Sequence, residues 1–405
     1  MFASTQETLA PTANNLFTLA AVETPNRNIK LSIARNALRI ALDLLAEVVE
    51  AKQAYPLFSH LLLEARADRL RLRGVGLYNT LQCDVEADVQ QTGSFCLPAK
   101  KLADIVRHLP AATIDLISNA EAATLKCGDS RFKLKTHATD EFPALAEANE
   151  TIATIPIEIL LTMLRTVLFA AARTADNGRY ALEGAQLTFS PTGLRVVATD
   201  GHRLLCVERS DLTRDDSVIL LLPRHSLPLI LKFLSVEPGE VQLRRNENKL
   251  VFQHGTRLLA CTLLDGAFPD CEPILLQEFQ HALTLEGTMF QAAIQRMAVF
   301  GTEGTGSSFG VIRFHFAPDG STSRYEVQSF APGSGEGQEE ILPLTADAQE
   351  AVTISFNGRY LLDFARTISA SAITIQYNDA RTSVAISPAT DNGCVVRYIL
   401  MPCLV

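Results

Sequence analysis

The chain of 405 residues has no apolar run long enough to cross a bilayer. Its longest apolar stretches, such as VILLLP at residues 218–223, are far shorter than the roughly 20 residues that a membrane-spanning helix needs. No Lys or Arg precedes Arg27, so the N-terminus also lacks the basic and apolar regions of a secretory signal. These absences predict a cytoplasmic protein that does not associate with a membrane.

The cysteines show no pairing in the sequence. All eight are scattered singly, without a CxxC pair and without histidines clustered beside them. This pattern is typical of reduced thiols in protein cores and argues against structural zinc. We therefore expect no metal and no cofactor.

Two common signatures of an enzyme are also missing. The sequence contains neither a GxxxxGK[ST] phosphate loop nor an HExxH motif. The Gly-rich stretch GTEGTGSSFG at residues 301–310 follows an expected helix and precedes an expected strand, which is the wrong order for a dinucleotide loop. Asp200 and His202 could form an acid/base pair, but Asp-Gly more often makes a turn between strands. The sequence predicts a protein without catalytic activity.

What the chain does contain is a threefold repeat. Hydrophobic residues make up 47% and charged residues 20%, which is typical of a globular protein, and the length suggests two or three domains. Similar segments begin at Leu97, Leu222 and Phe356, and each has the pattern of a short helix, three strands, then an apolar residue and proline. The closing prolines lie 126 and 133 residues apart, and a Gly/Ser-rich insertion at residues 331–340 lengthens the second interval.

A further amphipathic helix precedes each of these segments. In the first, LRIALDLLAEVV from Leu38, apolar residues form one stripe and charged residues the opposite one, the pattern of a helix half buried on a sheet. Alternating strands follow, and SPTG at residues 190–193 is expected to form a hairpin turn. We expect an α+β fold of three similar domains, each with two helices on antiparallel sheets, at residues 28–149, 150–280 and 281–405, after a flexible N-terminal tail at residues 1–27.

The net charge of −9 by itself counts against a nucleic-acid partner. However, the basic and acidic residues are unevenly distributed along the chain. The six expected helices carry 12 basic and 6 acidic residues, so the strands and loops hold the acidic excess. If the helices share one side, that side could attract phosphates without reading bases. The same charges could equally be an ordinary solvated helix surface.

Five motifs in a fixed order are more specific. RYALEG is followed by VATDGHRL within residues 179–204, and these accompany LPAKKLADIVRHLP from Leu97, LLDGAFPD from Leu263 and the terminal RYILMPCLV from Arg397. Together they closely resemble the bacterial DNA polymerase III β subunit family, the β sliding clamps, over essentially everything after Asn28. The resemblance implies three tandem clamp domains per chain and a head-to-tail homodimer that forms a six-domain ring.

The resemblance also implies a function. The ring would encircle double-stranded DNA without sequence specificity and act as a processivity factor, a non-catalytic subunit of a DNA polymerase holoenzyme. A pocket between the second and third domains would receive the short motif of the DNA polymerase III α subunit, the clamp loader and other clamp-binding-motif proteins. The matching positions here are Leu182, Thr199, Gly201, His202, Arg203, Leu204, Pro269, Ile274, Asn357, Tyr360, Ser383, Ile399, Leu400, Met401 and Pro402.

An apolar cleft with a few polar groups at its rim suits an extended peptide, and Met401 would supply an adaptable wall. Without the resemblance, the apolar members Leu182, Ile399 and Leu400 could be plain core. By analogy with the family, DNA contact falls to Lys52, Arg179, Tyr180 and, at an expected helix start, Arg224. The ring joint falls to Phe132 against Val299 and Phe300, which could equally be core residues of their own domains.

Three departures from the family pattern favour an alternative. The chain reads GVGLYNTL from Gly74 where the family usually carries a T-D-x-E type strand, has Pro273 where a basic residue is common, and ends in CLV. These changes suggest a diverged paralogue that acts as an inhibitor-resistant, regulatory or partner-binding copy. Loading onto DNA would separate a working clamp from such a copy.

Overall fold

The structure is a computed structural model that describes residues 27–49, 56–119, 121–139, 142–145, 147–173, 180–301, 310–317, 324–331, 335–346, 351–389 and 393–403. The chain forms two compact units. The first comprises the described residues up to Asn149 together with Val251–Ala260, and the second comprises Glu150–Leu250 and Cys261 onward. In the part of the chain that is described, no helix is long and apolar enough to span a membrane.

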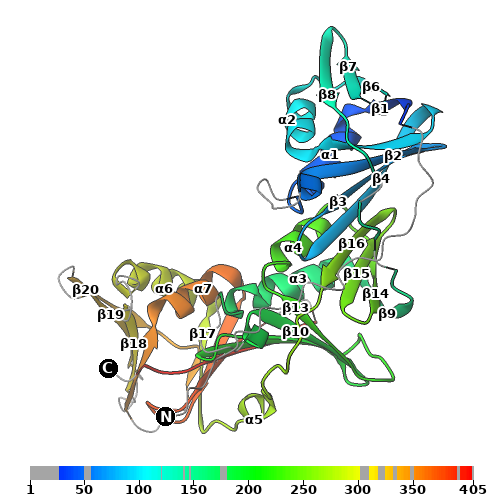
Figure 1. Ribbon diagram of the computed structural model, residues 1–405. Coiled ribbons are helices and arrows are strands. Elements are labelled where there is room, and N and C mark those ends of the chain that lie inside the picture. The colour runs from blue at the N-terminus through cyan, green and yellow to red at the C-terminus, as the bar shows by residue number, and fades with distance from the viewer. Residues whose placement is uncertain are drawn as a thin grey trace, which may run out of the picture. The chain divides into compact units, whose positions relative to one another are not determined.

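The first unit consists of two helices on antiparallel strands, coloured blue to cyan in Figure 1. Its strands run in the order β8-β7-β6-β1-β4, and β4 also pairs with β3, which leads on to β2 and β5. Helix α1 packs on β1, β3 and β4, and α2 packs on β2 and β5. The elements are β1 (Lys30–Ala34), α1 (Arg35–Leu45), η1 (Pro56–Ser59), β2 (His60–Arg66), β3 (Arg69–Val75), β4 (Asn79–Gln91), β5 (Gly93–Pro98), α2 (Ala99–His108), β6 (Thr113–Ser118), β7 (Ala122–Cys127) and β8 (Ser130–Lys135).

Helix α1 shows how the amphipathic pattern sets the packing. Leu38, Leu42 and Leu45 are buried against the sheet, as their spacing predicts. On the opposite face Arg39 and Asp43, one helical turn apart, form an ion pair of 2.9 Å. The helix ends at Leu45, before the end of the expected segment LRIALDLLAEVV at residues 38–49, and the chain turns over residues 46–48.

The second unit is built around a continuous antiparallel sheet of nine strands in the order β13-β10-β11-β12-β25-β24-β23-β17-β21. A four-stranded sheet, β20-β19-β18-β22, and the pair β9 and β14 complete the sheets of this unit. Helices α3, α6 and α7 lie along one side of the unit in Figure 1. The elements from residue 150 onward are β9 (Glu150–Pro156), α3 (Ile157–Val167), η2 (Leu168–Ala170), η4 (Tyr180–Leu182), β10 (Gly184–Ser190), β11 (Gly193–Thr199), β12 (Arg203–Arg209), β13 (Val218–Pro223), α4 (Leu227–Leu234), β14 (Glu240–Asn246), β15 (Lys249–His254), β16 (Arg257–Thr262), α5 (Glu272–Leu275), β17 (His281–Glu286), α6 (Gly287–Gly301), β18 (Val311–Ala317), β19 (Arg324–Ala331), β20 (Gly335–Ile341), β21 (Thr345–Ala346), β22 (Val352–Asn357), α7 (Gly358–Thr367), β23 (Ala372–Tyr377), β24 (Val384–Pro388) and β25 (Val395–Leu400).

The repeated pattern of one helix followed by three strands is confirmed. It appears as α2 with β6, β7 and β8, as α4 with β14, β15 and β16, and as α7 with β23, β24 and β25. The preceding helices are α1, α3 and α6. The domain boundaries expected at 149/150 and 280/281 stay predictions, and the second of them falls within the second unit.

The hairpin expected from SPTG is also confirmed. Strands β10 and β11 pair antiparallel, with Ser190 opposite Gly193 at the turn. Gly193 has φ of 129°, and a Cβ placed there would lie 2.2 Å from the Arg209 carbonyl oxygen. Glycine is therefore required both for the backbone conformation and for the close approach of β12.

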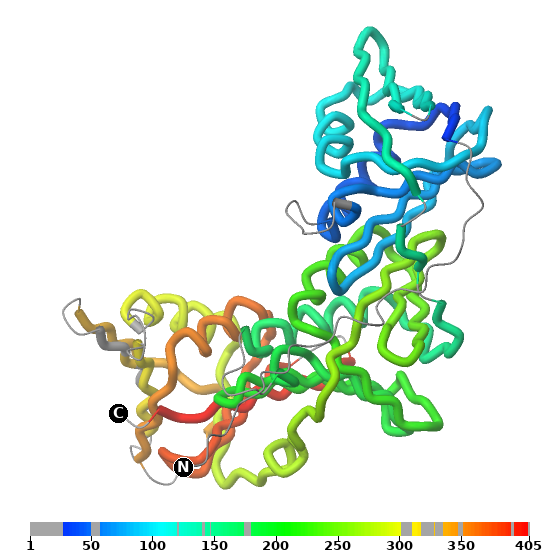
Figure 2. The backbone as a smooth tube through the Cα atoms, viewed as in Figure 1, coloured from blue at the N-terminus to red at the C-terminus, as the bar shows by residue number. Residues whose placement is uncertain are grey.

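Two segments late in the chain complete the sheets of the second unit. Residues 335–341, which begin within the Gly/Ser-rich insertion at residues 331–340, form β20, which pairs with β19 from Gly335 to Ile341. The last strand, β25, inserts between β12 and β24, with Arg203 opposite Leu400. Figure 2 shows this C-terminal segment in red beside the green strand β12. The C-terminal motif thereby reaches the VATDGHRL turn.

Candidate functional site

A tight turn joins β11 to β12. Gly201 at its tip has φ of 91°, which glycine adopts readily. The Thr199 hydroxyl accepts a hydrogen bond from the Gly201 amide (3.1 Å) and donates one to the Arg203 carbonyl oxygen (2.6 Å). Oδ1 of Asp200 accepts from the amides of His202 (3.0 Å) and Arg203 (3.1 Å). The segment is the turn that Asp-Gly predicts, and the Asp200 carboxylate is engaged in holding it.

The Arg203 side chain anchors this turn to its surroundings. Only 9% of it is exposed, and its Nε donates to Asp200 Oδ2 (2.9 Å) while its Nη1 donates to Asp363 Oδ2 (2.8 Å). Its Nη2 donates to the Phe169 carbonyl oxygen (2.7 Å), and its guanidinium carbon lies 4.2 Å from the centre of the Tyr360 ring. Although burial opposes its charge, the surrounding groups, the two carboxylates among them, hold the pKa of Arg203 above its ordinary value.

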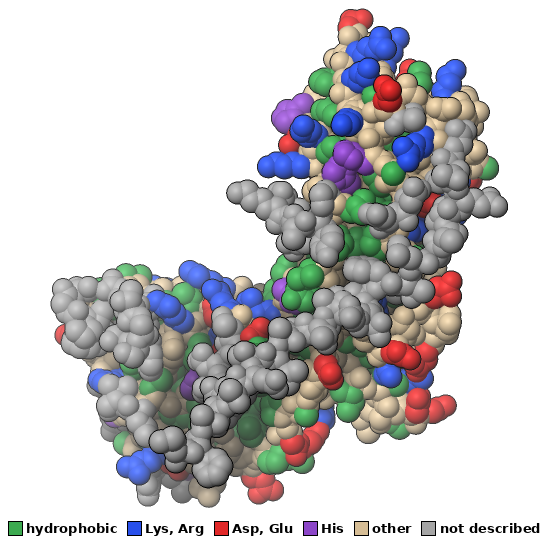
Figure 3. Space-filling view, in the orientation of Figure 1, with side chains coloured by type: hydrophobic (Ala, Val, Ile, Leu, Met, Phe, Trp, Pro, Cys, Tyr) green, Lys and Arg blue, Asp and Glu red, His purple; other side chains and the backbone are tan. Residues whose placement is uncertain are grey.

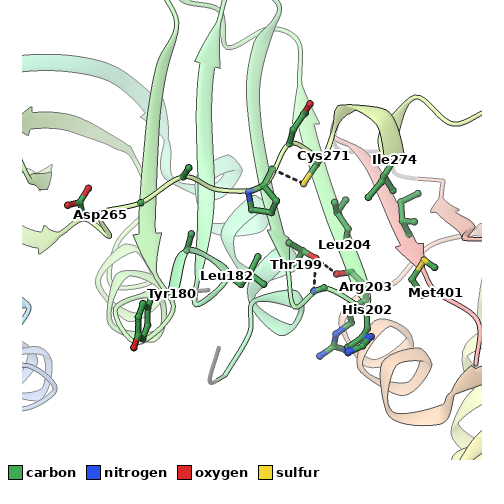
Figure 4. A pocket seen from close by; sticks show the side chains of 17 residues that line it. Tyr180, Leu182, Thr199, His202, Arg203, Leu204, Asp265, Cys271, Ile274 and Met401 are labelled. Atoms are coloured by element: carbon green, nitrogen blue, oxygen red, sulfur yellow. Dashed lines mark hydrogen bonds between the residues drawn. The ribbon is translucent and has the colours of Figure 1, made fainter. Parts of the chain in front are cut away.

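A cavity of about 670 Å³ opens beside this turn. Figure 4 shows Tyr180 and Leu182 on one side of it, Ile274 and Met401 on the other, and Cys271 at the edge of the loop above. Its lining comes from η4, the β11–β12 turn, the loop before α5, α5 itself and the end of β25. The lining residues are Tyr180, Ala181, Leu182, Thr199, Gly201, His202, Arg203, Leu204, Asp265, Gly266, Ala267, Pro269, Asp270, Cys271, Ile274, Ile399 and Met401.

The cavity has a rigid apolar floor and adaptable walls. Leu204 and Ile399 are buried members of a core cluster, so the floor is fixed by packing. Ile274 and Met401 are 42% and 45% exposed, and they present apolar surface to the cavity. The Met401 amide donates to the His202 carbonyl oxygen (3.0 Å), which holds the C-terminal segment against the turn.

One wall carries a thiol. Burial raises the pKa of Cys271 to about 11, and the neighbouring Asp270 and Glu272 act in the same direction. Its Sγ lies 3.3 Å from the Pro269 carbonyl oxygen. Cys271 is thus a neutral, weakly polar wall group at neutral pH.

Most of the positions implied for the partner pocket lie around this one cavity. Ten of the fifteen line it, and they come from segments up to 219 residues apart in the chain. They are Leu182, Thr199, Gly201, His202, Arg203, Leu204, Pro269, Ile274, Ile399 and Met401.

The other five positions do not line the cavity. The Asn357 side chain caps α7 by accepting from the Arg359 amide (3.0 Å), and Tyr360 stacks on Arg203. The Ser383 hydroxyl donates to Gln277 Oε1 (2.6 Å). Of the remaining two, Leu400 is fully buried core and Pro402 is half-buried.

Sequence reasoning missed part of the lining. The missed residues lie next to Leu182 and in the loop after Leu264, which carries the quoted motif LLDGAFPD. The motif LLDGAFPD was the sequence signal that could have identified this loop as part of the lining, but only its Pro269 was predicted to lie in the pocket. The missed residues are Ala181, Asp265, Gly266, Ala267, Asp270 and Cys271.

Of the four positions implied for DNA contact, two lie among the described residues. Lys52 and Arg179 lie outside the described residues. Tyr180 is 66% exposed and lines the cavity just described. Arg224 precedes α4, which begins only at Leu227, and lines a second, smaller cavity.

The three positions implied for a ring joint have apolar surface. Phe132 is 37% exposed on β8, the last strand in the order of the first unit's sheet, and Val299 is 62% exposed near the end of α6. Phe300 is half-buried. No group of three or more His, Cys, Asp or Glu among the described residues could hold a metal ion.

Comparison with known proteins identifies three matching family models in chain order. They are the DNA polymerase III beta subunit N-terminal domain at residues 29–146, the central domain at residues 154–270 and the C-terminal domain at residues 273–403. A beta sliding clamp of Synechococcus elongatus is 29% identical over 383 residues, covering 92% of this chain and 99% of that protein. A beta sliding clamp of Pseudomonas putida is 28% identical over 376 residues, covering 92% of this chain and 98% of that protein.

Solved structures agree with these matches. The crystal structure of a DnaN sliding clamp from Pseudomonas aeruginosa bound to griselimycin has a TM-score of 0.84 and 28% identity, covering 93% of this chain and 100% of that one. The crystal structure of the C. crescentus beta sliding clamp has a TM-score of 0.83 and 28% identity over the same shares of both chains.

Proposed function

We propose that this chain, which belongs to the DNA polymerase III beta subunit family, is a DNA sliding clamp. The observation that carries this proposal is the match of all three domains of that family, in order, over residues 29–403 with short gaps. In this role the chain has no catalytic activity of its own. It would act in the cytoplasm as the processivity subunit of a DNA polymerase.

The comparisons favour a working clamp over the alternative of a regulatory or inhibitor-resistant paralogue. The curated relatives named beta sliding clamp align over 92% of this chain. The departures at Gly74, Pro273 and the C-terminus leave the three-domain fold intact. Pro273 is the second residue of α5 and does not line the cavity, so its change from a basic residue leaves the apolar floor unaltered.

The cavity beside the β11–β12 turn suits the tethering of a short peptide. Its volume of about 670 Å³ holds a few side chains, and its floor at Leu204 and Ile399 offers apolar burial. Ile274 and Met401 can adjust to anchors of different shape. We assign it to a linear motif with one or two apolar anchors, carried by the polymerase α subunit, the clamp loader and other clamp-binding proteins.

We further propose that two chains join head to tail into a six-domain ring around duplex DNA. Exposed apolar side chains at Phe132 and Val299 are suited to such a joint. The helices would face the DNA, because they carry more basic than acidic residues while the chain as a whole is acidic. Binding would be held by topological linkage and would not depend on base contacts.

A loading assay on circular DNA tests this function. The protein is incubated with its cognate clamp loader, ATP and a nicked circular plasmid, and bound protein is separated by gel filtration at high salt. We expect the clamp to stay on the circle through high salt and to leave when the circle is linearised, because linkage does not weaken with salt whereas phosphate contacts do. Equal, salt-sensitive binding to circular and linear DNA would contradict a sliding clamp.

A further inference from the structure

The cavity beside the β11–β12 turn, which we call the peptide cavity, has an acidic wall. Residues 258–295 include the loop before α5, and they contain five acidic residues but no Lys or Arg. Two of the acidic residues, Asp265 and Asp270, line the cavity, and both are exposed. Figure 3 shows acidic side chains among hydrophobic ones in the lower part of the second unit, where Figure 1 places α5. The loop therefore brings negative charge to a cavity whose floor is apolar.

The two carboxylates of this wall have no counter-charge among the described residues. Neither Asp265 nor Asp270 has a Lys or Arg of the described chain within ion-pair distance. Asp270 accepts one hydrogen bond, from the Glu272 amide (3.0 Å). The neighbouring Glu272 side chain differs, because it pairs with Arg195, which also pairs with Glu208 (2.5 Å). Asp265 and Asp270 therefore present uncompensated negative charge at the cavity.

The one Lys or Arg among the described lining residues does not offset this charge. It is Arg203, whose guanidinium donates to Asp200 (2.9 Å) and to Asp363 (2.8 Å). Neither of these two carboxylates lines the cavity, and only 9% of the Arg203 side chain is exposed. Because two carboxylates already oppose the single charge of Arg203, the field that a ligand meets in the cavity is negative.

We propose that the peptide cavity selects a linear motif with Lys or Arg directly beside its apolar anchors, so that the basic side chain lies against Asp265 or Asp270. This inference rests on the proposed function of the cavity and specifies the class of partner that it tethers. A Lys or Arg side chain suits this place, because its aliphatic stem can cover an apolar wall while its charged end reaches an exposed carboxylate. An acidic residue at the same place would be repelled by both carboxylates.

The test uses the full-length protein and three synthetic peptides that share one pair of Leu anchors. The anchors are flanked on both sides by Lys, by Gln or by Glu, and isothermal titration calorimetry measures Kd. We expect the Lys-flanked peptide to bind roughly 3- to 10-fold more tightly than the Gln-flanked peptide, and the Glu-flanked peptide to bind more weakly by a similar factor, because each exposed charge pair contributes modestly. The preference should shrink at about 0.5 M NaCl, since salt screens exposed charges.

Substitution of the two carboxylates tests whether they cause the preference. Asp265→Asn combined with Asp270→Asn removes both charges and keeps the side-chain oxygen that accepts from the Glu272 amide. We expect this double variant to bind the Gln-flanked peptide as the wild type does and to reduce the preference for Lys to within about 2-fold. Asp215→Asn is the matched control, because Asp215 is exposed in the same unit, follows the far end of β12 and does not line the cavity. This control should keep the wild-type preference.

The outcomes separate this inference from the proposed function. If the wild type binds the three peptides equally tightly, or prefers Glu, the basic motif is overturned while the role of the cavity in peptide binding stands. If the double variant keeps the wild-type preference for Lys, the assignment to Asp265 and Asp270 is overturned. If none of the three peptides binds, the inference and the proposed tethering role fail together.

Discussion

At the scale of single residues, Arg203 is the side chain that links the peptide cavity to the elements around it. It lines the peptide cavity, holds the β11–β12 turn through Asp200 and reaches α7 through Asp363. Because it is only 9% exposed, its charge is tolerated through these partners and the carbonyl of Phe169. One arginine thus joins the turn, the helix α7 and the short helix η2.

Two exposed apolar side chains should determine peptide affinity. We expect Ile274→Ala and Met401→Ala each to weaken binding of an apolar-anchored peptide by about 1–2 kcal/mol, or roughly 5- to 30-fold in Kd, because each removes two or three buried carbon groups from the complex. Isothermal titration calorimetry measures this with a synthetic peptide. Val395→Ala, which is 60% exposed on the same strand β25 but outside the cavity, should leave Kd unchanged. Equal effects of all three substitutions would contradict the assignment.

The thiol of Cys271 provides a pH-dependent reporter of the same cavity. Its pKa is raised from 9.0 to about 11, so the reactive thiolate should be roughly 100-fold scarcer at pH 8 than in an unperturbed thiol. We expect slow alkylation by iodoacetamide at pH 8, a rate that climbs until about pH 11, and protection by bound peptide. Mass spectrometry of tryptic peptides measures the rate. Cys403, half-buried outside the cavity, is the internal control, and its rate should not respond to peptide.

At the scale of elements, the sheet of the second unit depends on close strand approach at the β10–β11 turn. Gly193 combines φ of 129° with a Cβ position 2.2 Å from the Arg209 carbonyl oxygen. Any side chain there would both strain the backbone and push β12 away. Since β12 also carries Arg203 at its start, the turn supports the peptide cavity from the other end of the strand.

We expect Gly193→Ala to destabilise the protein by about 2 kcal/mol or more, because the substitution adds a steric clash to an unfavourable backbone conformation. Gly128→Ala should cost only about 1 kcal/mol. Gly128 also has positive φ, of 56°, but a Cβ added there would have no atom within 4 Å of it. Thermal unfolding followed by circular dichroism compares the two. A smaller loss at Gly193 than at Gly128 would show that the strand can move to accept the methyl group.

At the scale of the whole molecule, the proposed ring needs apolar contact between different chains. Val299 is 62% exposed near the end of α6, and Phe132 is 37% exposed on β8. We expect Val299→Asp to convert a dimer into a monomer of 44.1 kDa, because a carboxylate would be desolvated at the joint. Light scattering over a dilution series measures the mass. Ile219→Asp, at a 61% exposed position on β13, is the matched control and should remain dimeric. A dimeric Val299→Asp would place the joint elsewhere.

The sequence determined the repeated architecture, because apolar periodicity reports which face of a helix or strand is buried. Helices α1, α3 and α6 and the three units of one helix with three strands follow from that periodicity, as does the turn at residues 190–193. Their ends were less predictable: α1 stops at Leu45, short of the expected segment that runs to residue 49. Helix ends depend on where the chain must turn to pack, which periodicity does not record.

The partner-pocket positions were predictable only through resemblance to a family. Nothing in the local pattern connects Arg203 with Met401, and it is the pairing of β12 with β25 that brings these segments together. Local chemistry also did not separate Leu400, which is core, from Ile399, which lines the cavity. Neighbouring residues on a strand point to opposite faces, so their roles depend on what covers each face.

The tertiary structure alone decided that four arginines line the second, smaller cavity. Arg165 and Arg173 lie on and just after the α3–η2 segment, Arg224 precedes α4 and Arg366 lies on α7, and the sequence marks only Arg224 by resemblance. The net charge of this cavity depends also on Asp363, whose carboxylate accepts a hydrogen bond from Arg203, 160 residues earlier in the chain. A sequence records which charges a chain carries, whereas the fold decides which charges meet and which of them are neutralised, because electrostatic interaction depends on distance in space.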